Sequence, residues 1–191
     1  MTSASLVDAA DSILIVVDAQ PGFLAKLDPS VAEGVVSRIG WLVRVAAHLD
    51  IPVVVTEEEP DRNGPTDPTI VAVLPPGTTP HRKHFFGLAD QPDIMAAVEA
   101  TERRTAVLVG LETDVCVAHS AIGLAGRGYR VVAVSDATGS PGDAHAAGLE
   151  RMRSAGVLVT TTKGLYYEWI RSVETAYEIE AAVPPPAGLD L

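Results

Sequence analysis

The sequence predicts an α/β fold, with a mostly parallel six-stranded sheet between two layers of helices. Short apolar runs alternate along the chain with longer segments of helical periodicity. The runs are continuously apolar, as expected for strands that helices cover on both faces. The 191 residues suffice for one well-buried domain. We expect this single domain to span residues 1–183, followed by a Pro-rich tail at 184–191.

Each element in the first half of the chain carries its own local signal. ILIVV and PVVVT are apolar runs of strand length, and the segment between them has apolar side chains on one helical face. Acidic residues and prolines then indicate a surface loop, and Asp90 stands where a helix cap belongs. The predicted elements are strand 13–17, helix 31–49, strand 52–56, loop 57–68, a weaker strand 81–86 and helix 90–102.

The second half continues the alternation. TAVLV and RVVAVS are again continuous apolar runs, and Thr113 or Asp114 could cap the helix that follows the first of them. The predicted elements are strand 105–109, helix 114–126, strand 130–135, helix 143–155, strand 157–161 and short helices at 165–171 and 173–182. We expect the Rossmann-like strand order 3-2-1-4-5-6, in which ligands bind beyond the carboxyl ends of the strands.

Charge and cysteine usage limit the partners and the compartment. A formal charge of −11 disfavours nucleic acid and anionic membranes, whose binding depends on Lys and Arg. The single cysteine cannot form an intramolecular disulfide, and the acidic N-terminal segment lacks the basic start of a signal peptide. No run approaches the ~20 apolar residues of a membrane helix. We therefore expect a cytoplasmic protein that acts on a small molecule.

Three side chains at predicted strand ends could carry chemistry. Cys116 falls in a first helical turn, where backbone N–H groups and the helix dipole favour a thiolate; the alternative is a buried cysteine acting as a small hydrophobe. Asp18 could be a general base or a turn residue before Pro21. Lys83 could neutralise that carboxylate or belong to a solvated basic segment.

Three motifs occur in order along the chain: DAQPGF after the first strand, a lysine before a Phe–Phe pair, and GLETDVCV. Together they resemble the isochorismatase-like cysteine hydrolases, a family that includes nicotinamidases, carbamoylsarcosine amidases, ureidoacrylate hydrolases and biuret hydrolases. The resemblance continues through SDATGSPGDAHAAGLERMRSAGVLVTT and covers about residues 12–162. It implies that Cys116 is the nucleophile, Asp18 the carboxylate that activates it, and Lys83 the third member of a catalytic triad.

The same resemblance implies further site residues. The backbone N–H groups of Glu112 and Cys116 correspond to the oxyanion hole of the family, and a cis peptide is expected between Leu111 and Glu112. Phe23 corresponds to an aromatic residue of the substrate pocket. We assign Gln20 and Leu111 to the pocket as well, although the motif glutamine is expected to be structural and not catalytic.

Two comparisons within the family narrow the predicted activity. Nicotinamidases hold a metal with histidines after the second strand, whereas TEEEPDRNGPTDP contains no histidine; we expect neither a metal nor a cofactor. The presence of Cys116 disfavours a vinyl-ether hydrolase of the isochorismate type. The predicted function is cleavage of a C–N bond in a small amide, carbamoyl or ureido compound through a thioester. The alternatives are a vinyl-ether hydrolase of the isochorismate type and a catalytically idle scaffold protein. The resemblance to the family also favours a homo-oligomer.

Overall fold

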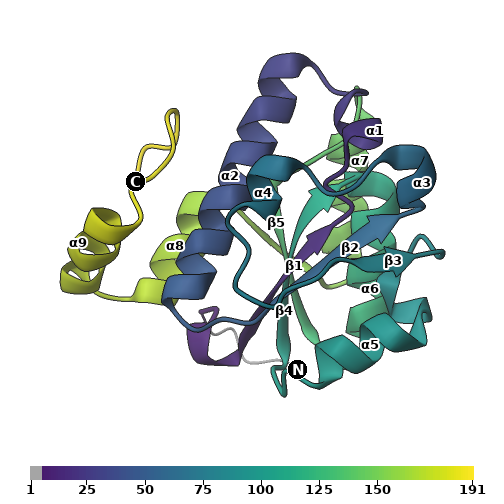
Figure 1. Cartoon of the computed structure of the whole chain (residues 1–191). Coiled ribbons are helices and arrows are strands. Elements are labelled where there is room, and N and C mark those ends of the chain that lie inside the picture. The colour runs from purple at the N-terminus through teal and green to yellow at the C-terminus, as the bar shows by residue number, and fades with distance from the viewer. Residues whose placement is uncertain (1–5) are drawn as a thin grey trace.

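The computed structural model describes residues 6–191, and a six-stranded sheet forms its centre (Figure 1). The strand order is β3-β2-β1-β4-β5-β6, and all neighbouring strands pair in parallel. The predicted order 3-2-1-4-5-6 is thus confirmed, and the sheet is wholly parallel. The strands are β1 (Ser12–Val17), β2 (Val53–Glu58), β3 (His81–Lys83), β4 (Thr105–Leu111), β5 (Arg130–Gly139) and β6 (Leu158–Thr160).

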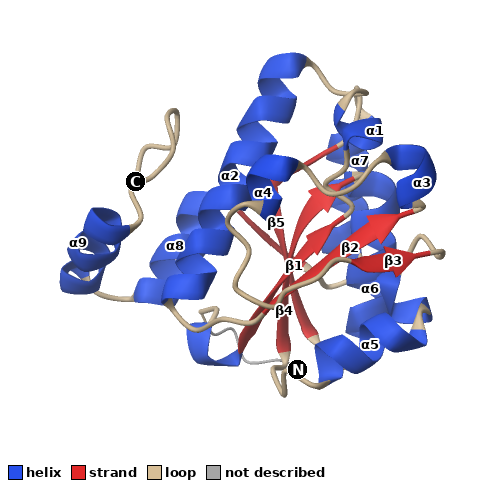
Figure 2. Cartoon of the chain, viewed as in Figure 1, coloured by secondary structure: helices blue, strands red, loops and turns tan. Residues whose placement is uncertain are grey.

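Helices cover both faces of the sheet and make the three layers that the sequence predicted (Figure 2). One face is covered by α2 (Pro29–His48) and α8 (Thr162–Ile170), with α9 (Val173–Ala182) outside α8. The other face is covered by α5 (Pro92–Glu99), α6 (Ala118–Gly126) and α7 (Ala144–Ser154). Short helices α1 (Pro21–Leu24), α3 (Pro60–Asn63) and α4 (Pro68–Val71) lie in the connections.

The continuous apolar run of β1 divides its side chains between two cores. Leu14 and Val16 pack in the cluster that includes α2 and α8, whereas Ile13, Ile15 and Val17 pack in the cluster that includes α5 and α6. All five are fully buried. Successive strand residues point to opposite faces, so a strand covered on both sides needs apolar residues at every position.

Two local predictions are wrong. Residues 57–68 are not all loop, because β2 continues to Glu58 through parallel pairing with β3, and α3 and α4 follow it. Asp90 does not cap the following helix: it lies in a 3-10 turn, and Gln91 is the N-cap of α5. Extra backbone pairing with a neighbouring strand is a tertiary effect that local polarity does not report.

The segment after β4 also differs from its prediction. Thr113–Val117 forms a π-helix before α6 begins, and its N-cap is Glu112, without a side-chain capping bond. Neither Thr113 nor Asp114 caps the helix, because both side chains bond to the segment at residues 140–145 instead. Thr113 Oγ1 lies 2.9 Å from His145 Nδ1, and Asp114 accepts a hydrogen bond from Ser140.

The C-terminal residues 184–191 form no helix or strand. Leu189 and Leu191 are nevertheless partly buried against the core that contains α2.

Within residues 6–191, no helix combines the length and the apolar character that a membrane span requires.

Candidate active site

Four side chains meet at the carboxyl edge of the sheet. Asp18 follows β1, Glu58 ends β2, Lys83 ends β3, and Cys116 lies in the π-helix after β4. Parallel strands present their carboxyl ends at the same edge, which is why residues so far apart in the chain converge. The sequence predicted Asp18, Lys83 and Cys116 as candidates, and the structure brings all three together with Glu58.

A fully buried ion pair lies at the bottom of this site. Lys83 Nζ is 2.9 Å from Asp18 Oδ2, and both side chains are 0% exposed. Lys83 Nζ also donates to the carbonyl oxygens of Phe85 and Phe86, at 2.7 and 3.1 Å. The hydroxyl of Thr56 donates to Asp18 Oδ1 at 2.7 Å. These contacts replace the water that the two charges lose on burial.

Burial is the main influence on the pKa values of Asp18 and Cys116. Burial raises the pKa of Asp18, and this effect exceeds the opposing influence of the Lys83 charge and of the hydrogen bond from Thr56. Burial is also the largest cause that raises the pKa of Cys116, followed by the negative charge of Asp18, while Lys83 lowers it. The resting form of Cys116 is therefore a thiol, and a raised pKa makes Asp18 a better proton acceptor than an exposed aspartate.

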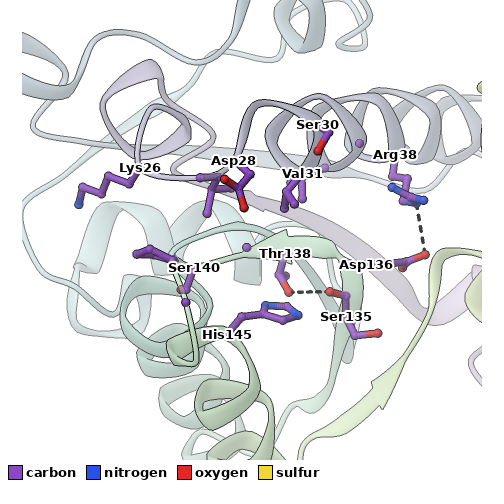
Figure 3. A pocket seen from close by; sticks show the side chains of 16 residues that line it. Lys26, Asp28, Ser30, Val31, Arg38, Ser135, Asp136, Thr138, Ser140 and His145 are labelled. Carbon is purple, nitrogen blue, oxygen red and sulfur yellow. Dashed lines mark hydrogen bonds and ion pairs between the residues drawn. The ribbon is translucent and has the colours of Figure 1, made fainter.

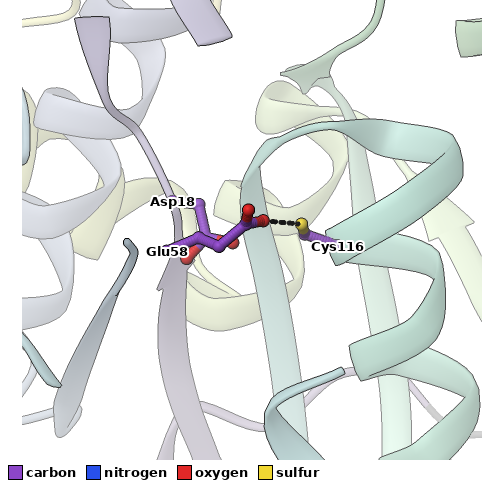
Figure 4. Close-up of side chains that lie close together, drawn as sticks. All are labelled: Asp18, Glu58 and Cys116. Carbon is purple, nitrogen blue, oxygen red and sulfur yellow. Dashed lines mark hydrogen bonds between the residues drawn. The ribbon is translucent and has the colours of Figure 1, made fainter. Parts of the chain in front are cut away.

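Glu58 is the site residue that sequence reasoning missed. The Cys116 thiol donates to Glu58 Oε2 at 3.1 Å (Figure 4), and the same oxygen lies 3.9 Å from Lys83 Nζ. A signal was present in the sequence. Side chains two apart on a strand share a face, so continuing the strand past Thr56 would have placed Glu58 on the side of Thr56 that faces Asp18.

Gln20 fixes the main chain of Glu58. Its Oε1 accepts from the Glu58 N–H at 2.7 Å, and its Nε2 donates to the carbonyl oxygens of Glu58 and Gly64 at 3.0 and 2.6 Å. Gln20 thus lies beside the site and holds the main chain of Glu58. Phe23 and Leu111 belong to the apolar core cluster that contains α2.

The segment that leads to Cys116 begins at a tight crossing of β1 and β4. Gly110 has φ +117°, and a Cβ there would lie 1.9 Å from the carbonyl oxygen of Val17, so only glycine fits. The peptide bond between Leu111 and Glu112 is cis. The Glu112 carboxylate is 3.1 Å from Lys26 Nζ, which ties the segment to the loop after α1.

Residues 12–164 match the Isochorismatase domain family model. The chain belongs to this family. Isochorismatase domain-containing protein 2A of Mus musculus is 32% identical over 164 residues, which cover 84% of this chain and 75% of the mouse protein. This chain is thus an isochorismatase-family hydrolase.

Solved structures agree with that assignment. YcaC from Pseudomonas aeruginosa, with hexane-2,5-diol and covalent acrylamide, superposes with a TM-score of 0.84 at 25% identity, covering 97% of this chain and 95% of that chain. MAR1 ribonuclease from Caenorhabditis elegans superposes with a TM-score of 0.83 at 25% identity, covering 98% of both chains. The isochorismatase fold accounts for nearly the whole length of this protein.

A separate cleft of about 580 Å³ opens between the start of α2 and the end of β5 (Figure 3). Lys26, Arg38, Asp136 and His145 are among its lining residues, which do not include Asp18, Lys83 or Cys116. Arg38 and Asp136 are paired across it at 3.4 Å. This cleft therefore adjoins the Thr113–Val117 segment through the contact between His145 and Thr113, without reaching the Cys116 thiol.

The site offers one set of ligand atoms for a metal within residues 6–191. Oxygen atoms of Asp18 and Glu58 and the sulfur of Cys116 lie within 4.8 Å of one another. Lys83 Nζ already contacts Asp18 and stands 3.9 Å from Glu58. Its charge would repel a divalent ion at this position, so the arrangement disfavours a metal centre.

Proposed function

We propose that this isochorismatase-family protein is a cysteine-dependent hydrolase that cleaves the C–N bond of a small amide, carbamoyl or ureido compound. The observation that carries the proposal is the fully buried Asp18–Lys83 pair beside the buried Cys116 thiol. Buried ion pairs add little to stability compared with apolar packing. Clustered groups with shifted pKa values are instead typical of sites that perform chemistry.

The proposed reaction has two stages. Asp18 accepts the proton of Cys116, and the thiolate attacks the substrate carbonyl. Asp18 returns that proton to the departing nitrogen, so that an amine or ammonia leaves and a thioester remains. Water then attacks the thioester, with Asp18 as the base, and its proton returns to the Cys116 sulfur. Lys83 keeps the charge of Asp18 compensated between these steps.

We assign stabilisation of the tetrahedral oxyanion to the backbone N–H groups of Glu112 and Cys116, following the resemblance to the family. Preorganised donors of this kind act strongly where water is excluded, and Cys116 is only 1% exposed. Gln20 keeps its proposed place at the pocket edge by holding the main chain of Glu58. Phe23 and Leu111 are proposed as the apolar wall behind the substrate.

The comparisons with known proteins bear on the choice of activity. The covalent acrylamide in Pseudomonas aeruginosa YcaC supports the idea that a protein of this fold carries a reactive nucleophile. The likeness to a protein named MAR1 ribonuclease raises RNA cleavage as a second activity. RNA phosphates would meet the carboxylates of Asp18 and Glu58 on a chain of formal charge −11, and this repulsion favours a small uncharged substrate.

Modification of Cys116 tests the nucleophile. Iodoacetamide should alkylate Cys116 stoichiometrically near neutral pH and abolish hydrolysis in an ammonia-release screen over small amides and ureido compounds. Cys116→Ala should lower kcat by at least about 10³-fold, while its thermal unfolding stays within a few degrees of wild type. Retained hydrolysis in Cys116→Ala would indicate direct attack by water, as in a vinyl-ether hydrolase. Absence of any turnover in the wild type would favour the idle scaffold.

Two controls accompany that screen. Exhaustive chelation should leave the activity unchanged, because Lys83 supplies the positive charge at Asp18; loss of activity with recovery on added zinc would contradict this. A single-stranded RNA should stay intact in the same assay. Cleavage of RNA that disappears in Cys116→Ala would make the ribonuclease activity the better assignment.

A further inference from the structure

Glu58 is the most accessible of the four clustered side chains. Its side chain is 16% exposed, whereas those of Asp18 and Lys83 are 0% exposed and Cys116 is 1% exposed. A molecule that approaches the thiol from solvent therefore meets the Glu58 carboxylate before it meets Asp18. This position suits recognition of a substrate.

The main chain that carries this carboxylate is firmly held. Gln20 bonds to both the N–H and the carbonyl oxygen of Glu58, and Asn63 Nδ2 donates to the same carbonyl at 3.0 Å. Glu58 also pairs with Lys83 in the β2–β3 register. The backbone position from which the Glu58 side chain extends is therefore fixed beside the site.

The Glu58 carboxylate depends on the thiol for its hydrogen bond. Among residues 6–191, the side-chain donor to Glu58 is Cys116. Lys83 Nζ stands 3.9 Å away and serves Asp18 and two carbonyl oxygens. Once Cys116 has given its proton to Asp18, Glu58 faces a thiolate without a donor. Two negative groups side by side in a water-poor site are unfavourable, so the substrate has to supply the missing donor.

We propose that Glu58 is a specificity residue that accepts a hydrogen bond from an N–H group on the carbonyl under attack. This inference rests on the proposed role of Cys116 as nucleophile. It selects primary amides and carbamoyl or ureido groups with free N–H bonds. It disfavours compounds that carry a carboxylate, a phosphate or a fully substituted nitrogen at the same position.

Three electrophiles that share the acrylic double bond and differ in the group on its carbonyl test this selection: acrylamide, N,N-dimethylacrylamide and acrylate. The rate of Cys116 modification by each is followed by intact-protein mass spectrometry and divided by its rate with N-acetylcysteine. The wild type should prefer acrylamide. Glu58→Gln keeps the shape and removes the charge, and it should raise the rate with acrylate relative to acrylamide by about tenfold. The disadvantage of N,N-dimethylacrylamide should shrink several-fold.

Glu59→Gln is the matched control. Glu59 is the neighbouring acid, and its carboxylate contacts the exposed ring of His84 and not the thiol, so its relative rates should equal those of the wild type. Glu58→Asp retains the charge one methylene farther back, so its relative rates of Cys116 modification should lie between those of wild type and Glu58→Gln. The negative charge of Glu58 contributes to the raised pKa of Cys116, so absolute rates should rise in Glu58→Gln at any given pH; the ratios remove this effect.

The outcomes separate this inference from the proposed function. Modification of Cys116 with the same relative rates in wild type, Glu58→Gln and Glu58→Asp would overturn the role of Glu58 and leave the nucleophile intact. If Cys116 reacts with none of the three electrophiles near neutral pH, in wild type and in every variant, both the role of Glu58 and the role of Cys116 as nucleophile would be overturned.

Discussion

Lys83 holds a positive charge in a place that water does not reach. Its neighbours are the carboxylate of Asp18 and two carbonyl oxygens. Because Asp18 is equally buried, each charge of the pair compensates the other. Removing one member of a buried pair leaves the other uncompensated. We expect Lys83→Met to lower the free energy of unfolding by about 3–5 kcal/mol, measured by urea denaturation.

A double-mutant cycle isolates this coupling. Lys83→Met combined with Asp18→Asn should recover a large part of the loss, because no unpaired charge remains. Arg82→Met is the control: Arg82 is half-exposed and pairs with exposed Asp61 at 2.6 Å, and its loss should change stability far less than the loss of Lys83. Strict additivity of Lys83→Met and Asp18→Asn would contradict the coupling.

Single residues were predictable where a strand end and a chemical motif coincided. Asp18 closes an apolar run, and Cys116 lies in a motif with a known family pattern. Glu58 had neither advantage, since three successive glutamates look like a solvated loop. Its place follows from backbone pairing with β3, a tertiary contact that side-chain polarity does not encode.

At the scale of elements, the Thr113–Val117 segment that carries Cys116 packs against α7. His145 Nδ1 lies 2.9 Å from Thr113 Oγ1, and Ser140, just before α7, donates to Asp114 at 2.6 Å. Gly148 lies against Asp114 so closely that a Cβ would stand 2.7 Å from its backbone nitrogen. The sequence predicted a helix here but not its first π turn, because these contacts come from a distant part of the chain.

This close approach leads to a test of positioning. Gly148→Ala should push the segment Thr113–Val117 and lower kcat by roughly 10²-fold, since small displacements of reacting groups are costly. Gly126→Ala is the matched control within a helix, because a Cβ at Gly126 meets nothing within 4 Å. Activity is measured on the best substrate from the screen, and stability by thermal unfolding. Equal activity in the two variants would show that α7 does not position the nucleophile.

At the scale of the whole molecule, the strand order was predictable because regular β–α alternation leaves few topologies. The surface was not predictable, since exposure depends on which apolar residues the core leaves out. Phe85 and Phe86 are 52% and 57% exposed, and Val173 and Tyr177 are 63% and 71% exposed. Exposed apolar side chains that gather in this way are typical of surfaces that associate.

We therefore expect a homo-oligomer, in line with the family resemblance, with a mass in light scattering that is a multiple of 20.0 kDa. The Phe85–Phe86 pair is the surface nearest the site, because its carbonyl oxygens hold Lys83 Nζ and the Phe86 ring packs edge-on against His119. Phe86→Ser should shift the protein toward monomers and lower kcat, as the loop around Lys83 loosens. Tyr177→Ser, on α9, should lower kcat less, whatever its effect on association. A wild-type mass of 20.0 kDa at tens of micromolar would contradict the expectation, as would full activity of a monomeric Phe86→Ser.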